Sequence, residues 1–402
     1  MSDSIHELFA GDITAPAGYR AAGVHCGLKR SKLDLALILS DRPATVAGVF
    51  TRNVVKAAPV LVSQRVVAGG AARAILCNSG NANCCTGERG MNDAQDMASQ
   101  LAEELGLVSS HVAVCSTGHI GAWLDMAAVR AGIPKVVAEL GSSGAAAAEA
   151  VLTTDTVPKT SAARIRLAGG EVVVGGMSKG AGMIHPDMAT TLCFLTTDAA
   201  VPAPVLQEAL GAAIDGSFNC ITVDGDTSTN DTALALANGA AGVEVPDSGP
   251  DFDAFVAGLA AVALELAKMV VRDAEGGTKL IGVTVEGAAD AAEAKRAANT
   301  IATSPLVKTA FYGCQANWGR IIAAAGRASV AMVEAETRIW FNSVLVAEGG
   351  MVVDDNLAAA EAELRKPNVD VRIDLASGAA ATTVWTSDLT EEYIRINGSY
   401  IS

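Results

Sequence analysis

A threonine that follows a constrained turn is the feature of this sequence best suited to chemistry. Thr190 heads an apolar stretch directly after the small residue Ala189, and Gly180, Gly182 and Pro186 precede it. Glycine permits unusual backbone turns, and a proline keeps the residue before it extended. In such a turn the threonine hydroxyl can attack the carbonyl carbon of Ala189. Cleavage of that bond would free the α-amino group of Thr190.

The freed amine would supply the base that the hydroxyl needs. An α-amino group has an unperturbed pKa near ~7.7–8.0, so a useful fraction is unprotonated near neutral pH. Threonine activated by its own N-terminal amine is a recognised nucleophile. We therefore predict self-cleavage between Ala189 and Thr190, and acyl transfer through Thr190. The sequence Ala-Thr-Thr alone is more often structural, so the prediction rests on the whole string at 179–194.

Acyl transfer also requires hydrogen-bond donors for the negatively charged oxygen of the tetrahedral intermediate. Thr117 and Gly118 follow an apolar stretch at 111–115 that is typical of a β-strand. We expect this strand to end in a Thr-Gly turn, and we take Thr117 and Gly118 as the candidate donors. An ordinary strand-ending turn is the structural alternative.

The string GMIHPDMATTLCFLTTDA at 182–199 resembles the cleavage-site signature of the ornithine acetyltransferase (glutamate N-acetyltransferase) family. Other stretches occur in the order in which that family has its motifs, so the resemblance extends along nearly all of the chain. They are CNSGNANCCTGERG (77–90), VCSTGHIG (114–121), LTTDTVPK (152–159), DGDTSTNDT (224–232), DAEGGTK (273–279), CQANWGR (314–320) and YIRINGSYIS (393–402).

The resemblance implies a layered α/β (α+β) fold of the N-terminal-nucleophile type. Such a fold is a sandwich of sheets flanked by helices, here with a smaller C-terminal α/β domain. Two chains, 1–189 and 190–402, would remain associated after cleavage, and the cleaved protomers would form a larger homo-oligomer. The expected activity is ping-pong acetyl transfer from N2-acetylornithine to glutamate through acetyl-Thr190, in the cyclic pathway of arginine biosynthesis. No cofactor is expected, and the use of acetyl-CoA as a second donor stays open.

The resemblance also assigns roles to single residues. The Thr117 hydroxyl and the Gly118 N–H would hold the oxyanion. Lys179 would bind the α-carboxylate that both substrates share, and Glu275 would bind the side-chain ammonium of ornithine. Three more positions match substrate contacts: Thr153, Asn397 and Ser402, the last of which is more often threonine in the family.

Other functions are compatible with parts of this pattern. A self-cleaving amidohydrolase or aminopeptidase would use water in place of glutamate, and Lys179, Glu275 and Asn397 favour the transferase over it. A related acetyltransferase of a β-lactam biosynthesis pathway shares the motifs. An uncleaved binding protein is the third alternative, and the intact Ala189–Thr190 junction argues against it.

The remaining sequence alternates apolar strands and helices, as a layered α/β protein requires. A packed domain boundary is expected near residue 285. Strands are predicted at 33–40, 45–50, 58–67, 73–80 and from 190 or 191 to 199, with a hairpin at 163–182 and a last strand at 391–402. Helices are predicted at 91–105, 143–152, 251–272, 288–298 and 355–365.

Composition argues against several classes of protein. A formal net charge of -15, without a long block of Lys and Arg, argues against nucleic-acid binding. The eight cysteines form no CxxC pair and histidine is scarce, so no metal site is expected. The start of the chain does not match a signal peptide, and the apolar stretch at 254–264 is too short to span a bilayer. We therefore expect a cytoplasmic protein without membrane contact.

Overall fold

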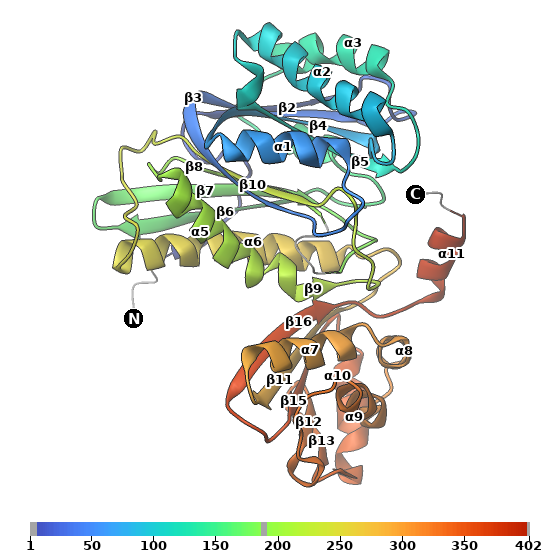
Figure 1. The fold of residues 1–402 in the computed structure, drawn as a ribbon. Coiled ribbons are helices and arrows are strands. Elements are labelled where there is room, and N and C mark those ends of the chain that lie inside the picture. Colours follow the sequence, from blue (N-terminus) through green and yellow to red (C-terminus); the bar gives the residue numbers. More distant parts are fainter. Residues whose placement is uncertain (1–5, 186–190, 400–402) are drawn as a thin grey trace.

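A long, bent strand joins the two layers of the larger of two structural units (Figure 1). The computed structural model describes residues 6–185 and 191–399. Strand β3 (Leu35–Phe50) pairs in its first half with β2 (Tyr19–Val24) and β4 (Ala71–Asn81), and in its second half with β10 (Thr232–Ala237). Its register with β4 shifts between Leu39 and Ala44, as expected where a strand bends.

The sheet of the larger unit has the order β1-β6-β7-β8-β10-β3-β4-β5, with β2 beside β3. Its other strands are β1 (His6–Phe9), β5 (Val112–His119), β6 (Lys159–Leu167), β7 (Gly170–Lys179) and β8 (Leu192–Thr197). Successive side chains of a strand point to opposite faces of the sheet. Because successive residues of these strands are apolar, both faces of the sheet are apolar. Ile38 and Phe194 lie in the core between the two halves of the sheet, whereas Leu37 and Leu195 lie in the outer cores.

Helices cover both outer faces of this folded sheet (Figure 1). One outer core is shared with α2 (Gly87–Leu105) and α3 (Met126–Ala138), and the other with α5 (Ala203–Asp215) and α6 (Pro250–Arg272). A short helix, α4 (Ala145–Ala150), packs into the core between the layers. The predicted layered α/β fold, with sheets flanked by helices, is confirmed.

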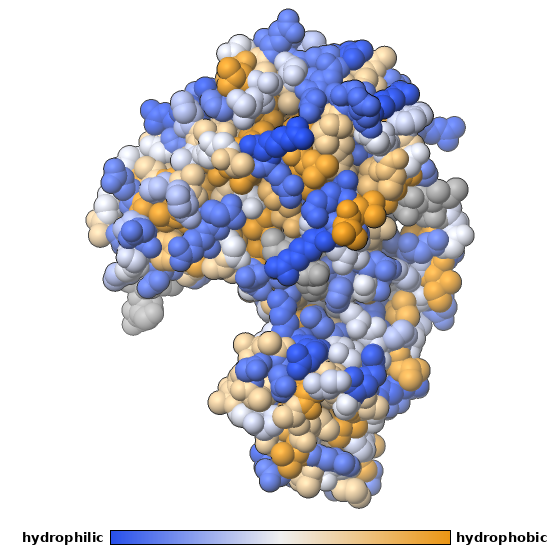
Figure 2. Space-filling view, viewed as in Figure 1, coloured by the Kyte–Doolittle hydropathy of each residue, from blue (hydrophilic) through white to orange (hydrophobic). Residues whose placement is uncertain are grey.

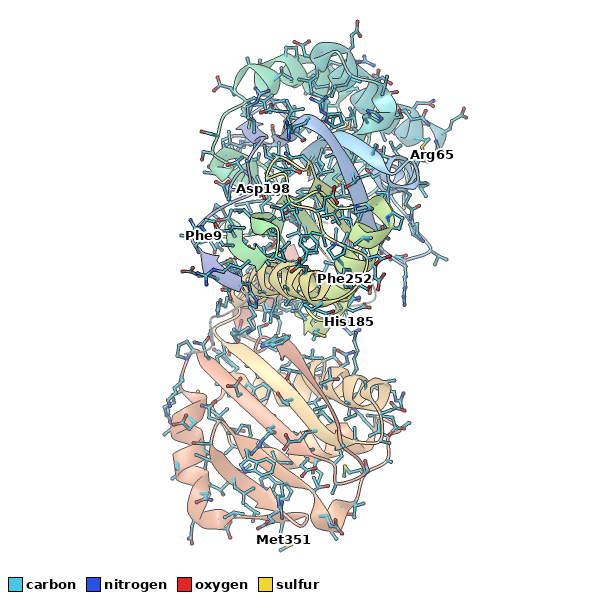
Figure 3. All side chains as sticks on the ribbon, turned by 90° about the vertical axis from the view of Figure 1, so that its left-hand side faces the viewer. Phe9, Arg65, His185, Asp198, Phe252 and Met351 are labelled. Atoms are coloured by element: carbon cyan, nitrogen blue, oxygen red, sulfur yellow. The ribbon has the colours of Figure 1, made fainter. Side chains whose placement is uncertain are left out.

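The smaller unit has a second sheet with its own core, and Figure 3 shows it stacked below the larger unit, with His185 near the junction. The strand order is β14-β13-β12-β15-β11-β16-β9. The strands are β9 (Ile221–Thr222), β11 (Leu280–Ala288), β12 (Arg338–Phe341), β13 (Val344–Glu348), β14 (Met351–Val352), β15 (Asn368–Asp374) and β16 (Ala380–Thr386). The helices are α7 (Ala291–Ala302), α8 (Pro305–Tyr312), α9 (Trp318–Gly326) and α10 (Leu357–Leu364).

Residue 285, near which a boundary was expected, lies inside β11. The chain passes into the second sheet before that position, in the segment between α6 and β11. It also crosses between the units elsewhere, because β9 pairs with β16 through Ile221 and Trp385. The division at 189–190 falls outside the described residues and stays a prediction.

Two segments predicted as strands are helices. Residues 58–67 form α1 (Ala58–Ala68), which has Pro59 in its first turn, where proline is well tolerated. Residues 391–399 form α11 (Glu391–Ser399), and the Tyr393 N–H donates to the Thr390 hydroxyl at 3.2 Å, as at a helix N-cap. The predicted helices at α2, α4, α6, α7 and α10 are confirmed to within a few residues at each end.

Helix α6 matches the helix predicted at 251–272 and extends well beyond the apolar stretch at 254–264. It has 23 residues with a mean hydropathy of 2.0 over its best window, so by length and composition it could cross a membrane. The stretch at 254–264 is therefore only part of a helix that meets this criterion of length and composition. In the fold, Leu259, Leu266 and Val270 of α6 are fully packed in the core against the sheet. On the face in Figure 2, hydrophilic and apolar side chains are interspersed over both units.

Candidate active site

One pocket brings together most of the residues predicted to do chemistry. It lies where the ends of β5 and β7 meet the start of β8 and the segment before β10, and its volume is about 120 Å³. The predicted residues in its wall are Thr117, Gly118, Thr153, Lys179, Glu275 and Asn397. The sheet and the two segments that follow α4 and α6 therefore carry distant parts of the chain to one place.

Thr117 and Gly118 lie within β5 and not in a turn after it, which corrects the predicted position of the turn. Gly118 pairs with Gly80 of the parallel strand β4. Its φ is +132°, and a Cβ atom at this position would lie 2.4 Å from the Gly80 carbonyl carbon. Only glycine tolerates both constraints. This close approach of two backbones holds the neighbouring Thr117 at the pocket wall.

Lys179 is the last residue of β7, and its side chain is nearly buried, with 8% of the residue exposed. Its Nζ atom donates a hydrogen bond to Oγ1 of Thr117 at 3.3 Å. Among the described residues, no carboxylate lies within salt-bridge distance of this ammonium. Since the ionised Asp155 acts on this ammonium only from a longer distance, an anionic group of a ligand in direct contact with Lys179 would be favoured.

Asp155 joins the backbone that follows this lysine to the segment at 153–159. Its Oδ1 accepts hydrogen bonds from the Gly180 N–H at 2.7 Å and from Lys159 Nζ at 2.8 Å, while Oδ2 accepts one from the Thr153 N–H at 3.0 Å. Burial alone would raise the pKa of Asp155, but the positive charges of Lys179 and Lys159 outweigh it and hold this pKa below its usual range. Asp155 therefore stays ionised and positions Thr153 and the end of β7.

Glu275 places a nearly buried carboxylate in the same pocket, with 8% of the residue exposed. Its backbone N–H donates to the Ala181 carbonyl at 2.9 Å, and its Oε2 accepts a hydrogen bond from Nδ2 of Asn397 at 2.8 Å. A Cβ atom on Gly182 would lie 2.5 Å from this carboxylate, so the glycine leaves the space that Glu275 occupies. No cation of residues 6–185 or 191–399 forms an ion pair with it.

Asn397 reaches the pocket because the chain leaves the smaller unit after β16 and forms α11 beside the larger unit (Figure 1). Tyr393 of the same helix donates from its hydroxyl to Oδ2 of Asp224 at 3.2 Å. Asp224 also accepts hydrogen bonds from the Met183 and Ile184 N–H groups, at 2.7 Å and 2.8 Å. Asp224 therefore holds the turn at 183–184 and joins it to α11, and the described residues contain no group of three or more His, Cys, Asp or Glu that could hold a metal ion.

Three residues that line or support the pocket were missed by the sequence analysis. The Asn230 amide donates to the carbonyls of Ala82 and Ser116, at 2.7 Å and 2.8 Å, which ties the segment before β10 to β4 and β5. Asp231 and Thr191 line the pocket, and Oδ2 of Asp231 and Oγ1 of Thr191 are buried without a described hydrogen-bond partner. The polar run DGDTSTNDT was the available signal for Asn230 and Asp231.

Burial raises the pKa of the Asp231 carboxyl well above its usual range, although hydrogen bonding by Ser228 and the charge of Lys179 act in the opposite direction. The pKa of Asp231 is thus shifted in the opposite direction to that of Asp155. Ala189, Thr190 and Ser402 lie outside the described residues, and their predicted roles stay predictions.

Comparison with known proteins gives consistent results. The ArgJ family model matches residues 20–402. The "Arginine biosynthesis bifunctional protein ArgJ" of Symbiobacterium thermophilum is 48% identical over 399 residues, which covers 98% of this chain and 99% of that protein. The protein of the same name from Geobacter sulfurreducens is 48% identical over 387 residues, with 95% and 98% coverage.

Solved structures with similar chains were also found. An ornithine acetyltransferase from Mycobacterium tuberculosis, solved in complex with ornithine, has a chain that is 46% identical, with a TM-score of 0.44. The match covers 46% of this chain and 100% of that one. A chain of the arginine biosynthesis bifunctional protein from Bacillus halodurans is 41% identical, with a TM-score of 0.44, covering 46% of this chain and 99% of that one.

Proposed function

Because this chain belongs to the ArgJ family, we propose that it carries an acetyl group from N2-acetylornithine to glutamate through Thr190. The enzyme is a glutamate N-acetyltransferase of arginine biosynthesis.

The main support for this proposal is that a nearly buried ammonium and a nearly buried carboxylate line the same pocket. Lys179 and Glu275 both line it, and neither forms an ion pair with any part of the chain that the structure describes. A ligand that supplies both counter-charges would offset the cost of burying them. N2-acetylornithine has such charges, since it carries an α-carboxylate and a side-chain ammonium. Glutamate shares the α-carboxylate, so Lys179 would serve both substrates.

Self-cleavage would prepare the nucleophile. Thr190 Oγ1 attacks the carbonyl carbon of Ala189, the peptide C–N bond breaks, and the acyl group moves from nitrogen to oxygen. Water then hydrolyses the ester, which leaves a carboxylate on Ala189 and a free α-amine and hydroxyl on Thr190. Thr191, one peptide unit away, lines the pocket.

In the first half-reaction, the α-amine of Thr190 accepts the hydroxyl proton as Oγ1 attacks the acetyl carbonyl. The tetrahedral oxyanion accepts hydrogen bonds from the Thr117 hydroxyl and the Gly118 N–H. Lys179 supports this arrangement because it donates to the oxygen of Thr117 and leaves the hydroxyl hydrogen available. The proton passes to the leaving nitrogen, ornithine departs, and the amine of glutamate then attacks acetyl-Thr190 by the reverse sequence.

Labelled acetyl groups test this route. Enzyme incubated with N2-[acetyl-labelled] ornithine alone should release ornithine and retain the label on the chain that begins at Thr190. Addition of glutamate should move the label to N-acetylglutamate. Labelled acetate released at the same rate without glutamate would identify a hydrolase instead. A lack of any reaction with N2-acetylornithine, combined with transfer from another acetylated amine, would identify the related acetyltransferase of a different pathway.

Three further parts of the proposal follow from the family resemblance. The two chains remain together, the cleaved protomers associate into a larger homo-oligomer, and the enzyme works in the cytoplasm. No cofactor takes part, because the nucleophile, the base and the oxyanion donors all belong to the chain. The same labelling assay with acetyl-CoA in place of N2-acetylornithine decides whether it is a second donor. Analytical ultracentrifugation decides the size of the assembly.

A further inference from the structure

Two neighbouring thiols lie in the loop that follows β4, outside the machinery described above. The Sγ atoms of Cys84 and Cys85 are 3.8 Å apart. Cys84 is fully buried, whereas Cys85 is exposed to solvent. Cys85 and Asn83 have φ values of +58° and +45°, which are uncommon for residues other than glycine. The loop is thus held in an unusual conformation that keeps the two sulfur atoms together.

This loop is bonded to the backbone on both sides of the predicted oxyanion donors. The Ala82 N–H donates to the His119 carbonyl at 2.9 Å, and the Gly121 N–H donates to the Cys84 carbonyl at 3.0 Å. The Asn230 amide joins the carbonyls of Ala82 and Ser116. Residues 116, 119 and 121 enclose the Thr117–Gly118 pair, so a change in the loop backbone is transmitted to that pair.

We propose that Cys84 and Cys85 form a reactive dithiol site which small disulfides oxidise to an intrachain disulfide, and that this oxidation lowers turnover. The Cys85 thiolate attacks one sulfur of a small disulfide, forms a mixed disulfide and releases one thiolate. The Cys84 sulfur then displaces the second thiol and forms the Cys84–Cys85 bond. Overall, the two cysteines are oxidised and the small disulfide is reduced to two thiols.

The order of these steps follows from exposure. Cys85 can be reached from solvent, while Cys84 is packed against Ala57, Val60 and Ala82. Burial raises the pKa of the Cys84 thiol, opposed by the Thr229 hydroxyl, so its thiolate is scarce at neutral pH. The second step should therefore accelerate as the pH rises. It uses no residue of the proposed catalytic route.

Ring closure must move the loop. The two Sγ atoms must approach from 3.8 Å to about 2.0 Å, while the peptide bond holds the two Cα atoms about 3.8 Å apart, closer than in ordinary disulfides. The backbone at 84–85 must therefore shift, and the hydrogen bonds from Gly121 and to His119 shift with it. A disulfide of this kind is readily reduced again, which makes the modification reversible.

The other cysteines are poor candidates for the same chemistry. Four of them are buried: Cys77, Cys115, Cys193 and Cys220. Cys26 and Cys314 are partly exposed, and neither has a second thiol in contact among the residues that the structure describes. Cys314 lies in the smaller unit, between α8 and α9, and therefore provides a control far from the pocket.

The test exposes the complete, processed enzyme to oxidised glutathione and then traps free thiols by alkylation. Intact mass and peptide sequencing should show a glutathione adduct on Cys85, followed by loss of the adduct and a Cys84–Cys85 disulfide. Turnover, which as a readout rests on the proposed function, should fall in parallel and return with dithiothreitol. Cys84→Ala should stop at the glutathione adduct, Cys85→Ser should form neither species, and Cys314→Ser should behave like the unmodified sequence.

Disulfide formation without any change in turnover would overturn the coupling to Thr117–Gly118. Absence of both species from the 84–85 peptide would overturn the dithiol site itself. The adduct and the disulfide are read from masses and therefore stand apart from a failure of the proposed function, in which the disulfide would form in a protein that never transfers acetyl groups. Inactivation that persists unchanged in Cys84→Ala and Cys85→Ser would also refute the proposal.

Discussion

The Lys179 ammonium donates to the Thr117 hydroxyl oxygen at 3.3 Å and thereby joins the end of β7 to β5, across the two layers of the larger unit. The positive charge favours polarisation of the Thr117 O–H bond, and this makes the hydroxyl a stronger donor. Lys179 therefore has two predicted tasks, since it can also bind an α-carboxylate. Substitution of the lysine should disturb both substrate binding and the oxyanion site.

Removal of the Thr117 hydroxyl should affect turnover more than substrate binding. We expect Thr117→Ala to lower kcat by ~10²–10³, the range seen for loss of single oxyanion donors. Thr117→Ser keeps the hydroxyl and is the matched control, with much smaller loss expected. Both variants must be shown to be cleaved before kcat and KM are measured. A kcat unchanged in Thr117→Ala would mean that this residue is only structural.

Substitutions of Glu275 and of Lys179 should impair the two half-reactions to different extents. Glu275→Gln removes a charge-assisted hydrogen bond worth roughly 1.5–3 kcal/mol, so N2-acetylornithine should become a poorer donor by roughly ten- to a hundredfold. Deacetylation by glutamate should suffer less, because its side chain carries no cation. Lys179→Met should slow both halves. Single-turnover acetylation and deacetylation measure the two steps separately, and equal losses in Glu275→Gln would refute recognition of the ornithine ammonium.

Gly182 should tolerate no side chain, for reasons of space. In Gly182→Ala the new Cβ would lie 2.5 Å from the Glu275 carboxylate, so Glu275 or the segment at 182 must move. We expect the KM for N2-acetylornithine to rise more than the KM for glutamate. Gly211→Ala in α5 is the control, because a Cβ atom there meets nothing within 4 Å. A Gly182→Ala variant with unaltered kinetics would show that the carboxylate position is unimportant.

Asp155 should stabilise the protein in a pH-dependent way. It pairs with the fully buried Lys159, whose Nζ also lies 2.6 Å from Asp273. Because the folded-state pKa of Asp155 is depressed, its contribution is present above the usual aspartate pKa of about 3.9 and is lost as the pH falls below that value. Asp155→Asn should therefore lower stability at pH near ~7 by about 3 kcal/mol, the lower end for a broken buried pair.

This loss should shrink only as the pH is lowered below about 4. Urea unfolding in an uncleaved Thr190→Ala background avoids the separation of the two chains. Asp41→Asn is the matched control, because Asp41 pairs with Arg20 at the surface, where each side chain is 43% exposed. Exposed pairs contribute roughly 0–1 kcal/mol, so that variant should change little. A loss in Asp155→Asn that is independent of pH would point to packing and not to charge.

Thr190 should be essential for both cleavage and transfer. Mass spectrometry of the mature enzyme should find a new N-terminus that begins TTLCFL. Thr190→Ala should remain uncut and inactive, and Thr190→Ser should still be cut because it retains a hydroxyl. A fully active enzyme of unbroken length would exclude the proposed nucleophile, since its α-amine would never be released.

The residues suited to catalysis could be predicted from short sequence motifs. Residues 179–194 combine glycine, proline, a small residue and threonine within one stretch, and the polar positions at 117, 153 and 275 each sit in a short motif. Long amphipathic or apolar helices such as α2 and α6 were also predictable, because their periodicity extends over several turns. These features depend on neighbours in the chain and need no tertiary contact to be recognised.

Short elements were decided by the tertiary structure. Residues 391–399 have a mixed pattern that was interpreted as a strand, yet the Thr390 cap and the contact of Asn397 with Glu275 place a helix there. Pro59 was the overlooked signal for α1. Where an apolar run is short, strand and helix patterns are indistinguishable, and packing against the rest of the protein selects one of them.

The sequence by itself determined the chemical groups of the site, while the fold alone decided how they meet. Nothing local indicates that Lys179 donates to Thr117, that Asp155 remains ionised or that Asp231 is buried with a raised pKa. Hydrogen bonds and pKa values depend on distances and on exclusion of water, and these arise only when strands remote in sequence are packed together.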